Sequence, residues 1–192
     1  MEYINEELIN KVAGDLNIKS KQVTDVLALL EGGATVPFIA RYRKEVTGGL
    51  DEEQIREIEK NYQYGVALEK RKKDVLRLID EKGMLTPELE EKINQSIKLV
   101  EIEDLYRPFK EKKKTKATEA IKLGLEPLAK AIMDFPMKGS KEELCAPFIN
   151  DNVKTMEDAL QGARYIIAEN ISDDADLRTW TRDNVRTYGK IV

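Results

Sequence analysis

Residues 51–83 have the sequence DEEQIREIEKNYQYGVALEKRKKDVLRLIDEKG, which carries start, period and stop signals of one long helix. Asp51 with Gln54 three residues later matches a capping box, and Gly83 marks a C-terminal stop. Between them the apolar residues recur with a period close to 3.6, at Ile55, Ile58, Tyr62, Val66, Val75, Leu76 and Ile79. The pattern predicts a helix to about residue 81, bent or divided at Gly65.

The helical period continues on both sides of this segment, and no convincing run of strict apolar–polar alternation interrupts it. Cap patterns predict further helix starts at Ser20, Thr86-Pro87, Ser140 with Glu143, Thr155 with Asp158, and Ser172-Asp173-Asp174. We therefore expect an all-α fold, a bundle-like array of roughly seven to ten helices with short turns. We treat residues 1–192 as one helical domain with two candidate sub-lobes, 1–50 and 51–192. The uncapped end at Val192 suggests a piece of a longer protein.

The composition excludes several function classes. The chain has 192 residues, 41% hydrophobic and 35% charged, which does not fit a membrane protein. It has no histidine, so every catalytic or metal-binding mechanism that needs one is excluded. One cysteine, Cys145, permits neither an intrachain disulfide nor a CxxC zinc site and fits a reducing cytoplasm. The formal net charge is -4 and the pI about 5.2, which argues mildly against tight unaided binding to nucleic acid.

The sequence offers no catalytic residue, metal site or cofactor motif, so we expect a protein that is not an enzyme. Neither phosphate-binding glycine motif, GxxxxGK[ST] or GxGxxG, is present. We expect Cys145 to be a small core residue. Two acidic groups are expected to cap helices or face solvent: Asp173, Asp174 and Asp176, and Glu101, Glu103 and Asp104.

One candidate nucleic-acid-binding region is the segment 106–117, YRPFKEKKKTKA. We call it the basic segment. Its cations are Arg107, Lys110, Lys112, Lys113, Lys114 and Lys116. Tyr106 and Phe109 are interleaved with them as candidate stacking residues, and a basic loop with aromatics can hold phosphates and stack bases. The alternative is a solvated connector whose aromatic side chains face the core.

A second candidate region is a helix-turn-helix-like pair joined at Gly32-Gly33-Ala34. Its second helix, expected from about residue 36 to 44, carries Arg41, Arg43 and Lys44. The N-terminal residues of that helix are nearly all apolar, which disfavours sequence-specific readout and leaves phosphate contact as the credible role. The alternative is that Phe38, Ile39 and Tyr42 pack inward while the cations pair with nearby acids.

Three stretches resemble a known family. Residues 33–51, GATVPFIARYRKEVTGGLD, closely resemble the first signature of the Tex family of bacterial transcription accessory proteins. Residues 103–117 with 124–129 resemble its second signature block, and residues 159–164 with 168–169 give a weaker third match. The resemblance implies an all-helical N-terminal Tex region. In the family this region is followed by a RuvC-like domain of the YqgF type, helix-hairpin-helix elements and an OB-fold RNA-binding domain, none of which is in this chain.

The resemblance implies RNA or DNA as partners of the full-length protein, chiefly through the absent C-terminal domains, and offers no catalytic residue. We therefore expect a cytoplasmic helical scaffold that adds at most weak, non-specific phosphate contacts. The alternative function is a protein-interaction or intramolecular docking module that meets the transcription machinery or other domains of the same chain.

Overall fold

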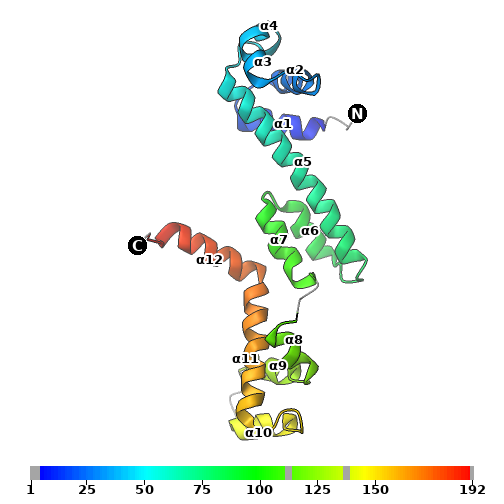
Figure 1. The fold of residues 1–192 in the computed structure, drawn as a ribbon, viewed down its shortest axis with the longest axis vertical. Helices are drawn as coiled ribbons and strands as arrows, with labels where there is room; N and C mark the ends of the chain where they lie inside the picture. Colours follow the sequence, from blue (N-terminus) through cyan, green and yellow to red (C-terminus); the bar gives the residue numbers. More distant parts are fainter. Residues whose placement is uncertain (1–4, 111–113, 136–138, 191–192) are drawn as a thin grey trace. The chain divides into compact units, whose positions relative to one another are not determined.

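The computed structural model describes residues 5–110, 114–135 and 139–190 (Figure 1). The chain divides into two compact units, residues 1–77 and 78–192. The first unit holds α1 (Glu6–Asp15), α2 (Ser20–Glu31), α3 (Val36–Tyr42), α4 (Lys44–Thr47) and most of α5 (Glu52–Asp80). The second holds α6 (Pro87–Gln95), α7 (Leu99–Tyr106), η1 (Arg107–Phe109), α8 (Lys116–Lys122), α9 (Glu126–Met133), α10 (Lys141–Cys145), η2 (Ala146–Phe148), α11 (Met156–Asp173) and α12 (Ala175–Tyr188).

The all-α prediction is confirmed. Across the described ranges the only β-type pairing is an isolated bridge between Asn150 and Val153. In the described ranges the helices are more numerous than expected, because turns such as Arg43 split segments that read as one helix in the sequence. The division into sub-lobes at residue 50 stays a prediction. None of the described helices combines the length and hydropathy that a membrane span needs.

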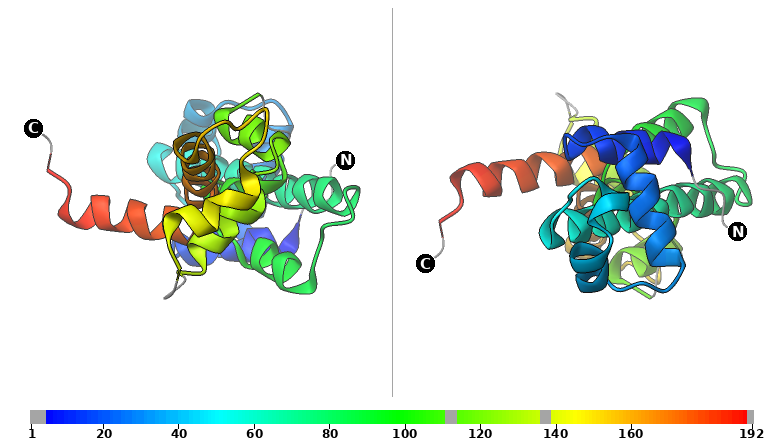
Figure 2. Two further views of the ribbon diagram at one scale, coloured as in Figure 1. Left: turned by 90° about the horizontal axis from the view of Figure 1, so that it is seen from below. Right: turned by 90° about the horizontal axis from the view of Figure 1, so that it is seen from above.

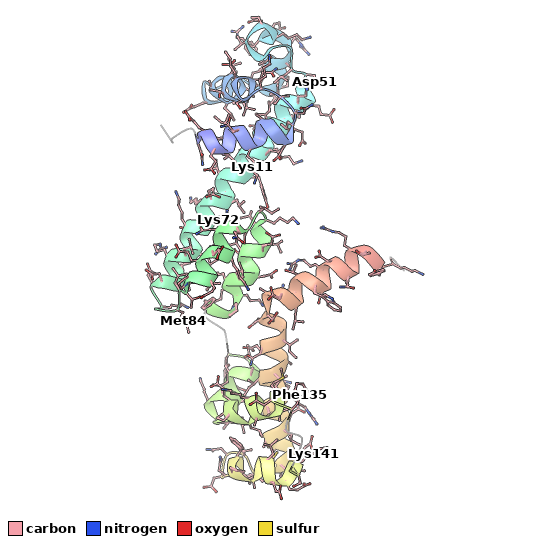
Figure 3. The ribbon with its side chains drawn as sticks, turned by 180° about the vertical axis from the view of Figure 1, so that it is seen from behind. Lys11, Asp51, Lys72, Met84, Phe135 and Lys141 are labelled. Atoms are coloured by element: carbon pink, nitrogen blue, oxygen red, sulfur yellow. The ribbon has the colours of Figure 1, made fainter. Side chains whose placement is uncertain are left out.

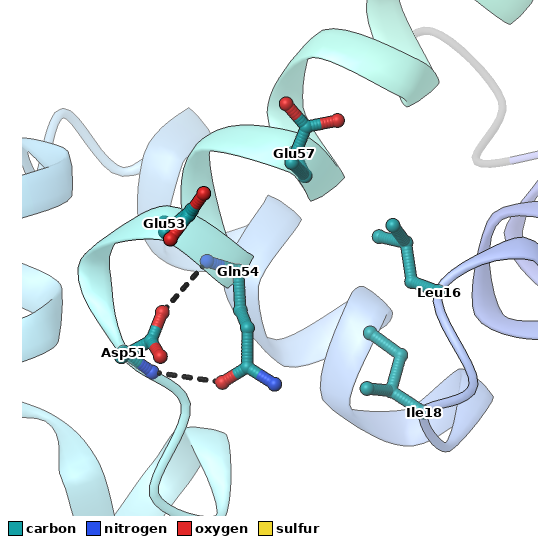
Figure 4. A pocket seen from close by; sticks show the side chains of 6 residues that line it. All are labelled: Leu16, Ile18, Asp51, Glu53, Gln54 and Glu57. Atoms are coloured by element: carbon teal, nitrogen blue, oxygen red, sulfur yellow. Dashed lines mark hydrogen bonds between the residues drawn. The ribbon is translucent and has the colours of Figure 1, made fainter.

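Helix starts follow the cap signals closely. The backbone N–H of Gln54 donates to Asp51 Oδ1 at 2.8 Å, and the N–H of Asp51 donates to Gln54 Oε1 at 3.1 Å (Figure 4). Reciprocal pairs of the same kind open α10 and α11 at the predicted positions. Two starts differ from the prediction: Lys19 precedes α2, and Asp174 alone caps α12 by accepting from Leu177 N–H.

The core of the first unit forms where α1, α2 and α3 meet the N-terminal half of α5 (Figures 1 and 2). Its members are fully or almost fully buried: Leu8, Ile9, Val12, Ala13, Val23, Val26, Val36, Ile39, Leu50, Ile55 and Ile58. Figure 3 labels Lys11 on α1 and Asp51 before α5, both among the exposed residues. This arrangement fixes α3 on the unit through its two buried side chains, Val36 and Ile39.

Gly65 does not divide α5, which runs unbroken for 29 residues. It lets α1 approach closely: a Cβ at position 65 would lie 2.2 Å from Leu8 Cδ1 and 3.1 Å from Leu8 Cγ. The sequence predicted a local defect because the contact that requires glycine comes from a residue 57 positions earlier in the chain.

Gly65→Ala is expected to destabilise the first unit by about 1 kcal/mol, because overpacking of about 1–3 kcal/mol outweighs a helix-propensity gain of about 1 kcal/mol. Gly14→Ala in α1 is the matched control, since a Cβ there meets nothing within 4 Å. That variant is expected to stabilise by up to about 1 kcal/mol. Urea unfolding, monitored by circular dichroism, measures the change in unfolding free energy of both variants. Equal stabilisation by the two alanines would contradict the close approach of α1 to α5.

The core of the second unit packs α11 against α8 and α9. Gly162 of α11 and Ala120 of α8 make the approach close, since a Cβ at position 162 would lie 2.3 Å from Leu125 Cδ1 and 3.3 Å from Ala120 Cβ. Cys145 lies in this core with no exposed surface, as predicted. Met84 and Phe135, labelled in Figure 3, lie outside the helices and are mostly exposed.

Two carboxylates of this unit contradict the expectation of solvated acids. Asp104 is buried on α7, where Arg178 Nε donates to its Oδ1 at 2.5 Å and Arg182 donates to its Oδ2. Asp173 is buried at the end of α11 and accepts from Arg107 Nε at 2.6 Å. The two arginines on Asp104 hold α12 against α7, and this matters because α12 itself has no buried residue.

Candidate nucleic-acid interface

The surface formed by α3 and α4 exposes two aromatic rings. The sequence pattern alone is equally compatible with rings buried in the core. Ile39 is fully buried, whereas Phe38 is 41% exposed and Tyr42 is 56% exposed. The alternative in which all three side chains pack inward therefore holds for Ile39 and not for the two rings. We call Phe38, Arg41, Tyr42, Arg43 and Lys44 the α3 patch.

The cations of the α3 patch are not neutralised within the described part of the chain. Neither Arg41 nor Lys44 forms an ion pair there, and both are exposed. The Arg43 guanidinium donates to the Tyr42 carbonyl oxygen at 3.0 Å, and its Cζ lies 5.1 Å from the Phe38 ring centroid. Three positive charges thus remain available to an external anion.

The backbone beneath the patch is held by α2. Gln22 Nε2 donates to the buried Thr47 carbonyl oxygen at 2.9 Å, which ties the end of α4 to α2. Gly48 follows with a φ of 70°, a left-handed value that suits glycine and ends α4. The cations of α3 and α4 therefore lie on a surface with a fixed backbone.

An open pocket of about 510 Å³ adjoins the patch. Phe38 and Arg43 line it together with two residues of α2 and four of the α2–α3 turn: Ala28 and Leu29, and Gly32, Gly33, Ala34 and Thr35. None of the described residues that line it carries a carboxylate. The pocket therefore combines apolar side chains, the Arg43 guanidinium and the exposed backbone of the turn. This combination suits a flat ligand with an anionic part.

The four described cations of the basic segment have partners inside their own unit. Arg107 pairs with Asp173, Lys110 Nζ lies 2.5 Å from Glu103 Oε2, and Lys114 Nζ lies 3.1 Å from Glu119 Oε1. Lys116 Nζ lies 5.0 Å from the Tyr165 ring centroid, above its face. Lys112 and Lys113 lie outside the described residues.

The two aromatic residues of the basic segment are half-buried. Lys110 Nζ lies 5.3 Å from the Tyr106 ring centroid, and Phe109 offers its carbonyl oxygen to Lys82 Nζ at 2.5 Å. The two candidate regions belong to different units, the α3 patch to the first and the basic segment to the second. Both stay predictions as binding sites.

A further cationic run, KRKK at 70–73, lies on α5 and could have been found from its charge alone. Lys72, labelled in Figure 3, pairs with Glu69 at 3.0 Å. Lys70 and Lys73 line an open groove of about 620 Å³ together with Glu31, Glu59 and Glu69. These carboxylates offset the two lysines, so the groove is a weaker anion site than the α3 patch.

Two other observations limit the chemistry of the described residues. The small pocket in Figure 4, about 170 Å³, is lined by Leu16, Ile18, Gln54 and three carboxylates, so it repels anions. In the ranges that the structure covers, no cluster of three or more His, Cys, Asp or Glu side chains could hold a metal ion. Burial raises the pKa of the Cys145 thiol, which keeps it protonated rather than nucleophilic.

Comparison of the sequence with known proteins places the chain in a family. Residues 6–80 match the Tex-like protein N-terminal domain, and residues 138–192 match the Tex central region. YdcI of Bacillus subtilis (strain 168) is 47% identical over 186 residues, covering 96% of this chain and 26% of that protein. The transcriptional accessory protein Tex of Neisseria gonorrhoeae is 40% identical over 177 residues, covering 92% of this chain and 23% of that protein.

The similarity extends to animals. The human S1 RNA-binding domain-containing protein 1 is 27% identical over 181 residues, covering 94% of this chain and 18% of that protein. The chain thus spans about a quarter or less of the length of the curated relatives it matches. Two Tex matches in chain order and relatives named Tex at about 40% identity identify the chain: it belongs to the Tex family and corresponds to its N-terminal region.

Proposed function

We propose that this chain is the helical scaffold region of a transcription accessory protein, and that it adds weak, sequence-independent phosphate contacts through the α3 patch. The observation that carries the proposal is the trio of Arg41, Arg43 and Lys44, which form no ion pair with the described residues. Relatives whose names contain "transcriptional accessory protein" and "S1 RNA-binding domain" support a nucleic-acid partner. On this proposal the region is cytoplasmic and not an enzyme.

The arrangement favours phosphate contact over base-specific readout. A helix that reads bases does so with side chains near its N-terminus, and α3 begins there with Val36, Pro37 and Phe38, of which Val36 is buried. The cations follow later, at the end of α3 and on α4. Contacts from such positions set affinity and orientation but carry no sequence information. The basic segment is the secondary surface, because carboxylates already partner Arg107, Lys110 and Lys114.

Replacing Arg41, Arg43 and Lys44 together with glutamine is expected to weaken binding at low salt by about tenfold or more for RNA and duplex DNA alike. Each lost phosphate contact lowers the magnitude of the slope of log K against log salt by about 0.7 on single strands and 0.9 on duplex. Fluorescence anisotropy with labelled oligonucleotides over a range of salt concentrations measures both quantities.

The control variant neutralises three exposed lysines elsewhere in the same unit: Lys11, Lys19 and Lys60. It changes the net charge equally, so it is expected to weaken binding only slightly. Equal losses in the two variants would mean that general charge, and not the α3 patch, governs binding. A third variant, Lys112, Lys113 and Lys114 replaced by alanine, measures the contribution of the basic segment.

A second candidate function is docking to protein, and α12 is the feature that favours it. Four large apolar side chains on this helix are exposed: Leu177, Trp180, Val185 and Tyr188. Trp180 is 64% exposed and Tyr188 is 77% exposed, whereas Arg178 and Arg182 of the same helix bind Asp104 of α7. Absence of nucleic-acid binding, together with saturable binding to a Tex C-terminal fragment added in trans, would favour this function over the first.

A further inference from the structure

We propose that the α3 patch binds unpaired nucleobases by stacking on Tyr42 and on the Phe38–Arg43 pair, so that this region prefers single-stranded nucleic acid to duplex. The proposal rests on the phosphate-contacting function proposed above and adds to it the bases as a recognised group. Its basis is the juxtaposition of two exposed rings, three unneutralised cations and an open pocket on one surface of the first unit.

The rings are presented in a form that suits stacking. Their centroids are 5.3 Å apart with an interplanar angle of 46°, so neither ring covers the other face to face. Arg43 lies over the Phe38 ring, which leaves Tyr42 as the more accessible ring and the guanidinium as a second flat surface. Aromatic rings and arginine planes are the side chains on which unpaired bases stack, whatever the base.

The surrounding charges favour a nucleic acid over an apolar protein surface. Between positions 38 and 46 there are three cations and one carboxylate, Glu45. The adjoining pocket has Leu29 and Ala34 on its walls and exposed backbone at Gly32 and Gly33, so a base edge would meet both apolar and hydrogen-bonding groups. Because Phe38 and Tyr42 lie on the same short helix as Arg41, a base and its own phosphate can reach the patch together.

The test compares wild type with the double variant Phe38→Leu and Tyr42→Leu on three labelled probes of equal length. These are an oligodeoxythymidine, the same backbone with abasic residues, and a duplex. Loss of stacking is expected to weaken binding to the oligodeoxythymidine by about tenfold or more, while the abasic strand and the duplex bind nearly as before. Leucine keeps an apolar side chain at both positions, and circular dichroism verifies that the variant is folded.

The outcomes separate this proposal from the one on which it rests. Equal loss on all three probes, or no loss on any, would overturn the stacking role while leaving the phosphate contacts in place. A wild-type chain that binds none of the probes at low salt would instead overturn the phosphate-contacting function itself. Ultraviolet cross-linking of a strand carrying 5-iodouracil provides a second readout, with the adduct expected on Tyr42 or Phe38 and no adduct there counting against stacking.

Discussion

Replacing Arg178 and Arg182 together with alanine is expected to release α12 from α7. Both guanidiniums bind the carboxylate of Asp104, whose side chain is only 5% exposed. Removing them leaves a buried carboxylate without its partners, which costs about 3–5 kcal/mol. Since α12 has no buried residue, it can leave and let water reach Asp104, so the second unit is expected to open locally rather than unfold.

Hydrogen exchange measures this release directly. In the double variant the amides of α12 are expected to exchange about a hundredfold faster or more, while those of α8, α9 and α11 keep their protection. The single tryptophan, Trp180, reports from the same helix, and its fluorescence anisotropy is expected to fall. Arg186→Ala is the control, because Arg186 is an exposed cation of α12 that forms no ion pair within the described ranges.

A triple variant separates the buried charge from the lost packing. Adding Asp104→Leu to Arg178→Met and Arg182→Met replaces the ionic cluster by apolar side chains. Such replacements are often neutral or stabilising, so we expect protection of α12 to recover in large part. Exchange in the alanine double variant that matches wild type would contradict the role given to the two arginines.

Replacing Ile39 with alanine is expected to destabilise the first unit by about 3 kcal/mol, within the range of about 2–5 kcal/mol for such truncations in a core. Ile39 has no exposed surface and is one of only two buried residues on α3. Phe38→Ala, one position earlier, is expected to cost about 1 kcal/mol or less, because that ring already faces solvent over much of its surface.

Urea unfolding of the two variants measures the contrast. At roughly 4–8 °C per kcal/mol for a unit of this size, Ile39→Ala is also expected to lower the melting temperature of the first unit by more than 10 °C. Comparable losses for Ile39→Ala and Phe38→Ala would mean that the Phe38 ring packs inward. In that case the α3 patch would lose the ring on which the Arg43 guanidinium rests.

Local signals explain why so much of the fold could be predicted. A capping box involves residues three positions apart, so Asp51 with Gln54, Ser140 with Glu143 and Thr155 with Asp158 locate helix starts without any knowledge of packing. The apolar period likewise identified Ile55 and Ile58 as members of the buried face of α5.

Features that depend on distant partners were predicted poorly. Asp104 reads as one more acid on a charged helix, because the arginines that bury it lie more than 70 positions later. From the sequence alone Gly65 is interpreted as a helix breaker, because the contact with Leu8 that requires a glycine comes from a residue far away in the chain. The residues of the α3 patch could be named from the sequence, but the direction of its rings depends on how Ile39 packs in the core of the first unit. The helical period is compatible with either a buried or an exposed ring at Phe38 and Tyr42, because both residues neighbour the buried Ile39 on the helix.

The α3 patch as a phosphate-contacting surface is tested by one salt titration. Wild-type chain and the Arg41, Arg43 and Lys44 glutamine variant are titrated against a labelled single strand, and log K is plotted against log salt. Loss of three phosphate contacts predicts a slope for the variant that is smaller in magnitude than that of wild type by about 2. A wild-type slope near zero, or a steep slope that survives the triple substitution, would contradict a nucleic-acid contact at this surface.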